Sequence, residues 1–209
     1  MSAQPTVFIV DGDAAVRHSL AELAGTLQIS VKCYETGESF LASIDPSLPG
    51  CLVLDMVLPD MDGTELQEKL GVRGIRLPVL FVSSCADVYR AVRAMKQGAI
   101  DVWEKPFDPK LLSAAIRTAI ELDATRRQKQ MRWEEIEGRF ARLTSDERLV
   151  LQCIIAGKTN KEIAVDLDVS LRTMYYRRAG LMRKLKVRSR AALIELLIST
   201  NKSLVESSH

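Results

Sequence analysis

The first half of the chain alternates between two kinds of segment, and this alternation restricts the possible folds more than any other feature. Short apolar runs are each followed by a longer stretch whose apolar residues recur every three or four positions. The first pattern predicts buried β-strands and the second predicts amphipathic helices. Strands separated by helices form a parallel sheet with helices on both faces, so we predict an α/β, doubly wound (βα)5 domain. The predicted strands are Thr6–Val10, Val31–Tyr34, Cys51–Asp55, Val79–Ser83 and Asp101–Trp103, and the predicted helices lie near 14–28, 37–43, 62–71, 87–97 and from about 108.

The second half of the chain has a purely helical pattern. The charged segment Glu121–Arg142 carries an apolar stripe, which predicts a long amphipathic helix. Thr144 and Thr159 each open a capping box, Ser170 can cap a longer helix to about Lys186, and a last helix follows over Arg190–Ser199. The middle two of these four short helices are separated by a tight turn, as in a helix-turn-helix unit. The predicted organisation is a domain at 1–122, a helical linker at 123–143, an all-α four-helix domain at 144–199, and a polar, frayed tail at 200–209.

Charged side chains follow three of the predicted strands, at the point where each strand ends. Asp11 and Asp13 follow the first strand, Asp55 ends the third, and Lys105 follows the fifth. Open α/β sheets place their chemistry at the carboxyl ends of their strands. An acidic loop, a single Asp and a Lys in this order suit a carboxylate that accepts a phosphoryl group beside a metal site and a cation. Gly12 stands between the two early acids.

Charge is divided unevenly along the chain. Residues 1–125 carry a net charge of −6 and residues 126–209 a net charge of +8, which together give the formal +2 of the whole chain. The basic second half indicates contact with nucleic acid. No apolar run approaches the ~20 residues that span a bilayer, and the N-terminus has no signal-peptide pattern, so we expect a cytoplasmic protein without membrane contact. The four cysteines have neither metal nor redox spacing, and we interpret them as small buried hydrophobic residues.

Several motifs resemble a known family. They are Leu54–Met56, Pro59–Gly63, Ala94–Ala99 and Glu104–Phe107. On these motifs, residues 1–122 resemble the receiver domain of bacterial two-component response regulators. Residues 144–199 resemble the LuxR-type helix-turn-helix. Together they look like a transcription factor of the NarL/FixJ class, on its FixJ-like branch.

This resemblance implies a role for each residue of the carboxylate site. Asp55 would be the phosphoacceptor, and Lys105 would supply a cation to a phosphoryl oxygen. Ser83 would bind the phosphoryl group through its hydroxyl, and Val102 stands at the position of the ring that moves in this switch. Mg²⁺ would be held by Asp11, Asp13, Asp55 and the backbone carbonyl of Val57.

Two positions depart from the family pattern. Gly12 replaces the second of two adjacent acids, normally the direct metal ligand, which predicts weak Mg²⁺ binding and slow or absent phosphorylation. Glycine also loosens the loop, so that Asp11 or Asp13 could swing inward. Val102 replaces Tyr or Phe, so either other groups, such as Trp103, carry the output or the domain switches poorly; we expect Trp103 to pack in the core.

The predicted recognition helix begins after Ser170. On a helical wheel, Met174, Leu181 and Leu185 share one face, directed to the core. The opposite face is basic and aromatic and suits a major groove, while flanking basic residues suit phosphates. The candidate DNA contacts are Arg172, Thr173, Tyr175, Tyr176, Arg177, Arg178, Ala179, Arg183 and Lys186 on this helix, with Lys158, Lys161, Lys184, Arg188 and Arg190 as phosphate contacts.

Three functions remain open at this point. The first is a regulator switched by phosphorylation at Asp55, with double-stranded DNA, a sensor histidine kinase and RNA polymerase as partners and a homodimer at least on DNA. The second is an atypical regulator whose degenerate site, marked by Gly12, acts independently of phosphorylation. The third, remote one is a phosphatase of the haloacid-dehalogenase type that uses Asp11 and Asp13; otherwise we expect no enzyme.

Overall fold

The computed structural model describes residues 4–84 and 88–206, with only the backbone described for 199–206. The chain divides into two compact units, with the division between Arg127 and Gln128. We call them the first and the second unit and describe each by itself. The elements of the first unit are β1 (Thr6–Val10), α1 (Ala14–Thr26), β2 (Ser30–Tyr34), α2 (Gly37–Ser43), β3 (Gly50–Asp55), α3 (Gly63–Val72), β4 (Val79–Ser83), α4 (Val88–Lys96), β5 (Asp101–Glu104) and the start of α5 (Pro109–Ala141).

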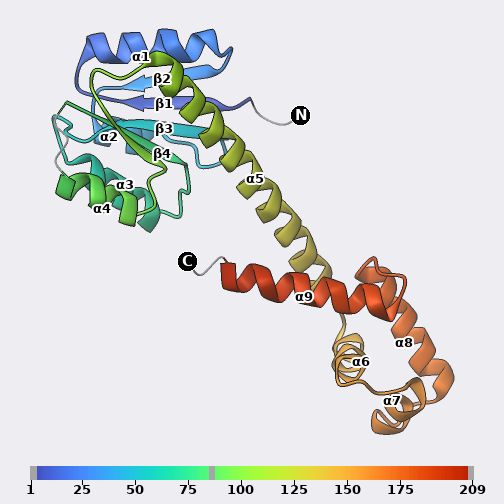
Figure 1. Cartoon of the computed structure of the whole chain (residues 1–209). Helices are drawn as coiled ribbons and strands as arrows, with labels where there is room; N and C mark the ends of the chain where they lie inside the picture. Colours follow the sequence, from blue (N-terminus) through green and yellow to red (C-terminus); the bar gives the residue numbers. More distant parts are fainter. Residues whose placement is uncertain (1–3, 85–87, 207–209) are drawn as a thin grey trace. The chain divides into compact units, whose positions relative to one another are not determined.

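The five strands form one parallel sheet in the order β2-β1-β3-β4-β5. The predicted doubly wound fold is therefore confirmed, and each predicted strand is present, three of them one residue longer. One face of the sheet packs against α1 and α5 through residues such as Leu20 and Ile116, and the other packs against α2, α3 and α4 through residues such as Phe40 and Leu66 (Figure 1). β1, β3 and β4 are buried on both faces, which explains their continuous apolar runs.

Side-chain caps start the helices that surround the carboxyl edge of the sheet. The carboxylates of Asp13 and Asp62 accept the amides of Ala15 and Thr64 and so begin α1 and α3. α3 must begin on a glycine, because a Cβ on Gly63 would lie 2.3 Å from the carbonyl oxygen of Asp55. The loop after β3 is thereby held close to the strand end that carries Asp55.

The second unit contains the end of α5 and four further helices, α6 (Ser145–Ile155), α7 (Asn160–Asp166), α8 (Leu171–Lys184) and α9 (Arg190–Glu206). Both predicted capping boxes are present, at Thr144 with Glu147 and at Thr159 with Glu162. Met174, Leu181 and Leu185 are fully buried, as their shared face predicts. They pack with side chains of α6, α7 and α9 into one core.

Three expectations need correction. α8 ends at Lys184, because Lys186 has a φ of 54° and leaves the helix. α9 continues to Glu206, so the backbone of 200–206 is helical where the sequence predicts a frayed tail. Cys33 is exposed, since it lies on the edge strand β2, whereas Cys51 is buried; Cys85 lies outside the described residues. The predicted fifth helix and the long amphipathic helix that follows it form one continuous helix, α5, which agrees with the prediction of a helix that runs out of the first domain.

Within residues 4–84 and 88–206, no helix combines the length and the apolar character that crossing a membrane requires.

Candidate functional site

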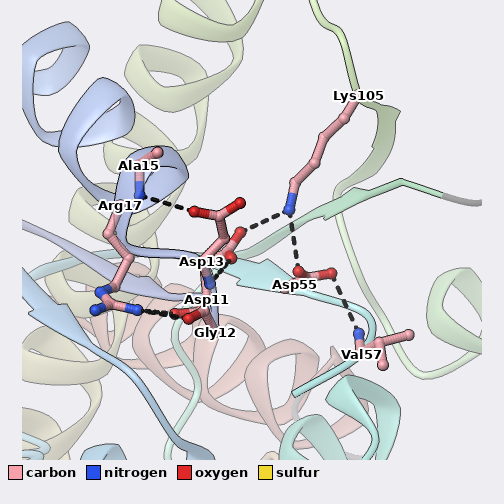
Figure 2. Close-up of polar contacts among 8 residues, drawn as sticks. All are labelled: Asp11, Gly12, Asp13, Ala15, Arg17, Asp55, Val57 and Lys105. Atoms are coloured by element: carbon pink, nitrogen blue, oxygen red, sulfur yellow. Dashed lines mark hydrogen bonds and ion pairs between the residues drawn. The ribbon is translucent and has the colours of Figure 1, made fainter. Parts of the chain in front are cut away.

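The carboxyl ends of β1 and β3 bring two carboxylates to one cation. Lys105 Nζ lies 2.7 Å from Asp11 Oδ2 and 3.0 Å from Asp55 Oδ2 (Figure 2). β1 and β3 are neighbours in the sheet, so Asp11 and Asp55 meet directly. Lys105 follows the edge strand β5 and reaches both carboxylates with its long side chain. Its amide donates a hydrogen bond to Ser83 O, and its peptide bond to Pro106 is cis. The three groups that the sequence predicts to converge are therefore together.

Burial governs the electrostatics of this cluster. Asp11 is fully buried, and its burial raises the pKa of the carboxyl group above its ordinary value, against the hydrogen bonds from Lys105 and the Asp13 amide. Burial also disfavours the charged form of Lys105. Its hydrogen bonds to Asp11 and Asp55 outweigh that effect and raise the pKa of the ammonium group. Lys105 therefore stays a cation beside Asp55.

The acidic loop is held in place despite its glycine. Asp11 Oδ1 accepts the amide of Asp13 at 2.8 Å. The Arg17 guanidinium donates to the carbonyl oxygens of Asp11 and Gly12 at 2.8 and 3.0 Å. The ring of Pro59 packs against Gly12, since a Cβ there would lie 3.1 Å from two ring carbons. These contacts hold the loop around Gly12. Arg17 was not among the predicted site residues, and its only sequence signal is its position in the first turn of α1.

The donors available to a divalent cation are few. Asp13 Oδ1 accepts the amide of Ala15, while the Asp11 and Asp55 carboxylates both contact Lys105 Nζ (Figure 2). Among the described residues, three or more His, Cys, Asp or Glu side chains gather nowhere in a way that could hold a metal ion. Mg²⁺ is commonly bound through one or two carboxylates and completed by water and phosphate oxygens. The Asp11 and Asp55 carboxylates therefore fit Mg²⁺, but with a reduced set of protein ligands.

The two predicted switch positions lie on neighbouring strands. Ser83 ends β4 and is 3 % exposed. Val102 is partly buried under α4, where it lines a shallow hollow with Ala91 and Met95. Trp103 packs on the opposite face of the sheet against the α1 and α5 side, which confirms its predicted place in the core.

In the second unit, α8 presents the predicted basic and aromatic face to solvent. Tyr176 is 78 % exposed and Tyr175 is 55 % exposed. Among the basic side chains predicted to contact DNA, all of which lie in the described part of the chain, four have neither a hydrogen-bond nor an ion-pair partner, and all four are exposed: Lys161, Arg172, Arg183 and Arg188.

The other basic side chains predicted to contact DNA are engaged with protein groups. Arg177 pairs with Asp146 at 2.5 Å, Lys184 pairs with Glu147 at 2.6 Å, and Lys158 pairs with Asp166 at 2.5 Å. Arg178 donates to the side chain of Asn160, Arg190 to Ile154 O, and Lys186 contacts Glu135. Asp146 and Glu147 lie more than 30 residues from their partners, whereas Asp166 lies eight residues from Lys158; only Glu147 has a sequence signal, its capping box.

This fold and these two sites define a transcriptional response regulator, and comparison with known proteins identifies its family. Residues 7–117 match the response regulator receiver domain, and residues 141–197 match the bacterial regulatory proteins of the luxR family. The chain belongs to the response regulators that join a receiver domain to a LuxR-type domain. It is a DNA-binding regulator of transcription controlled through its receiver domain, which implies a sensor kinase as partner.

Full-length relatives support this membership. FixJ of Rhizobium meliloti is 38 % identical over 194 residues, 93 % of this chain and 95 % of that protein. TmoT of Ectopseudomonas mendocina is 35 % identical over 193 residues, 92 % of this chain and 88 % of that protein. The structure of the response regulator StyR superposes with a TM-score of 0.88 at 40 % identity, over 93 % of this chain and 98 % of StyR.

Proposed function

We propose that Asp55 accepts a phosphoryl group and that this modification controls DNA binding by the second unit. The observation that carries the proposal is the position of the Asp55 carboxylate, 3.0 Å from Lys105 Nζ at the carboxyl edge of the sheet. A carboxylate there can act as a nucleophile next to a fixed cation. Phosphoryl transfer depends mostly on such positioning and charge stabilisation.

The chemical step needs no further protein nucleophile. An oxygen of Asp55 forms a bond to phosphorus while the bond between phosphorus and the donor breaks, and the leaving group departs with the electron pair. The product is an acyl phosphate on Asp55. Lys105 is placed to stabilise the negative charge on the transferred group, and the Ser83 hydroxyl is the third protein group that we assign to it.

Receiver domains generally bind Mg²⁺ at this site, and we propose that here Asp11, Asp55 and the Val57 carbonyl hold it weakly. When bound, Mg²⁺ supplies neutralisation of the phosphoryl charge. Gly12 removes one carboxylate from the usual set, while Arg17 and Pro59 fix the loop and prevent another acid from replacing it. We therefore infer slow phosphorylation at ordinary Mg²⁺ concentrations.

Labelling with acetyl phosphate and Mg²⁺, followed by mass spectrometry, tests both parts. Gly12→Asp is expected to lower the Mg²⁺ concentration for half-maximal labelling by roughly tenfold or more. Gly12→Ala is the matched control, because its Cβ displaces the Pro59 ring by the same few tenths of an ångström without adding a ligand. Equal labelling of wild type and Gly12→Asp would contradict the proposal that Gly12 weakens Mg²⁺ binding, but it would leave the phosphorylation of Asp55 standing.

A regulator that acts without phosphate is the second candidate, and the reduced ligand set favours it. In that case a protein partner or the unmodified receiver controls access to DNA. A mobility-shift assay on genomic fragments, with and without acetyl phosphate and Mg²⁺, separates the two. The phosphatase alternative gains no support from the geometry, because Asp13 caps α1; an assay with an aryl phosphate and Mg²⁺ tests it.

For the DNA-binding unit, we propose that α8 lies in the major groove. Arg172, Thr173, Tyr175, Tyr176, Ala179 and Arg183 face the bases, and Lys161 and Arg188 contact phosphates. The paired residues Lys158, Arg177, Arg178 and Lys184 are secondary candidates that must first exchange their protein partners.

We further propose that two copies bind a roughly palindromic site, with half-sites about one helical turn apart. Ile194 and Ile198, 41 % and 52 % exposed on α9, support such a homodimer. RNA polymerase is the proposed downstream partner. Footprinting of the bound fragment measures the half-site spacing, and a footprint of a single half-site would contradict the dimer.

A further inference from the structure

Two charged side chains of α5 hold the turn that leads into β3. Asp123 is 2 % exposed, and its carboxylate accepts the Gly50 amide at 2.9 Å and Arg127 Nε at 2.7 Å. The two charged residues are four positions apart on the helix and therefore lie on one face. We call this pair and its contacts with the turn at 46–50 the α5 clasp.

The Arg127 guanidinium makes most of the contacts with the turn. One of its terminal nitrogens donates to Ser47 O at 2.9 Å, and the other donates to Leu48 O at 2.5 Å and to Pro46 O at 3.3 Å. Together with Nε, all three nitrogens of the fork have acceptors. Lysine could not reproduce this pattern, because its ammonium group is a single point rather than a planar fork.

The turn itself depends on the clasp. Gly50 has a φ of +153°, and a Cβ there would lie 1.8 Å from Thr6 O, so the backbone passes directly against β1. The Gly50 amide is buried and finds its acceptor in Asp123. A buried amide without an acceptor is costly, so this turn and α5 support each other.

The clasp also lies beyond the part of α5 that covers the sheet. Leu112, Ile116 and Ala119 pack against the sheet, and Asp123 and Arg127 follow one and two turns later. The first unit accordingly includes α5 up to Arg127, five residues past the predicted domain boundary. From there α5 continues to Ala141, about 21 Å of helix at about 1.5 Å per residue.

We propose that the α5 clasp fixes the direction in which the linker helix leaves the receiver domain. Without it, the last contacts of α5 with the receiver would be those of Ala119 and Ile120, and the helix could pivot or fray from there. With the clasp in place, α5 moves as a rigid helix together with the receiver domain, so a displacement of the domain also displaces the linker part of α5. Asp123 and Arg127 are thus positioning residues for the output of the receiver.

Distance distributions between spin labels test this proposal on the full chain. One label is placed on the exposed native Cys33 and the other on Arg132→Cys, an exposed position beyond the clasp, with Cys85 and Cys153 changed to Ser. Arg127→Ala is expected to widen the distribution at least twofold, and Arg127→Lys is expected to widen it less. Arg126→Ala, which removes the same charge from the exposed neighbouring residue, is expected to match the wild type.

Equal widths for wild type, Arg126→Ala and Arg127→Ala would overturn the proposal. Arg127→Ala is preferred to Asp123→Ala because it leaves the Gly50 amide with its acceptor, so the fold is retained. Hydrogen exchange gives a second readout: the amides of 124–131 are expected to exchange faster in Arg127→Ala alone, while those of β1 and β3 stay protected.

A functional readout separates this inference from the proposed phosphorylation. The change in DNA affinity that acetyl phosphate and Mg²⁺ produce is expected to shrink at least threefold in Arg127→Ala and to persist in Arg126→Ala. If the DNA affinity of the wild type does not respond to the phosphoryl donor, the proposed control of DNA binding by phosphorylation of Asp55 is contradicted. The clasp is then decided by the distance distributions, which need no phosphoryl group.

Discussion

Both units of the molecule place cations beside carboxylates, but with opposite consequences for function. In the receiver, Lys105 is 14 % exposed and sits between two carboxylates at the edge where parallel strands end, so the ion pair itself forms the site. In the DNA-binding unit, the ion pairs of Arg177 and Lys184 hold α8 to α6 and remove those charges from the exposed face. The basic side chains that we propose for DNA contact are the four without protein partners, Lys161, Arg172, Arg183 and Arg188. Basic charge therefore locates function only when the partner of each cation is known.

The largest expected effect concerns the receiver side of this comparison. Asp55→Asn keeps the size of the side chain but removes the nucleophilic oxygen, so labelling by acetyl phosphate should fall by at least about a hundredfold. DNA binding by the unmodified protein should be unchanged, because the substitution lies in the other unit. Labelling that persists in Asp55→Asn would refute the phosphoacceptor assignment.

The next effect concerns the anchoring ion pairs of the DNA-binding unit. Glu147 is 7 % exposed and satisfies Lys184 as well as the Thr144 amide, so Glu147→Ala should lower the free energy of unfolding of this unit by about 2 kcal/mol. Glu162→Ala is the matched control, since Glu162 closes the same kind of capping box at an exposed position and should cost less. Urea unfolding followed by Trp133 fluorescence in a Trp103→Phe background measures both; equal losses would show that burial of the pair is unimportant.

A third prediction distinguishes the partner-free cations from the paired ones. Because we place Arg172 against the bases, Arg172→Ala should weaken DNA binding by roughly tenfold and relax base preference while the slope of log affinity against log salt stays nearly constant. Arg177→Ala should instead lower the stability of the unit and leave slope and base preference unchanged. The assignment fails if Arg177→Ala alters the slope and Arg172→Ala alters neither property.

The smallest expected effect is a difference in the response to acid. Burial of Glu147 raises its pKa, but the hydrogen bonds from Lys184 and Thr144 together with the Lys184 charge outweigh burial and lower it. The stabilisation is therefore present above the unfolded value of 4.5 and is lost as the pH falls through the lower folded pKa. Burial raises the pKa of Asp11 above 3.8, so the folded receiver binds that proton more readily and gains stability as the pH falls through the raised pKa towards 3.8.

Unfolding of each unit between pH 7 and pH 3 checks these opposite signs, with Trp103 and Trp133 as separate probes. Glu147→Gln should flatten the acid loss of the DNA-binding unit, and Asp11→Asn should remove a gain from the receiver. Acid profiles that neither substitution changes would rule out both assignments.

Much of this architecture could be predicted because local patterns specify it. The central strands of the receiver are continuous apolar runs because both faces of the sheet are covered. Thr144, Thr159 and Ser170 are N-cap residues, a type that marks the start of a helix in the sequence. Errors arose where a local pattern carries no information. Nothing in the polar composition of 200–206 indicates a helix, and the left-handed Lys186 ends α8 two residues before its pattern does.

The sequence by itself determined the doubly wound receiver, the helix-turn-helix unit and the convergence of Asp11, Asp55 and Lys105. The reason is that the succession of strands and helices along the chain follows from the local spacing of apolar residues. Only the tertiary structure decided which charges remain available. Arg17 and Pro59 fix the acidic loop around Gly12, Asp146 and Glu147 occupy two predicted DNA contacts, and Arg127 ties α5 to a turn some 80 positions away. The physical reason is that an ion pair, or a hydrogen bond from a side chain to a distant backbone carbonyl, depends on proximity in space. The spacing of residues along a chain does not encode that proximity.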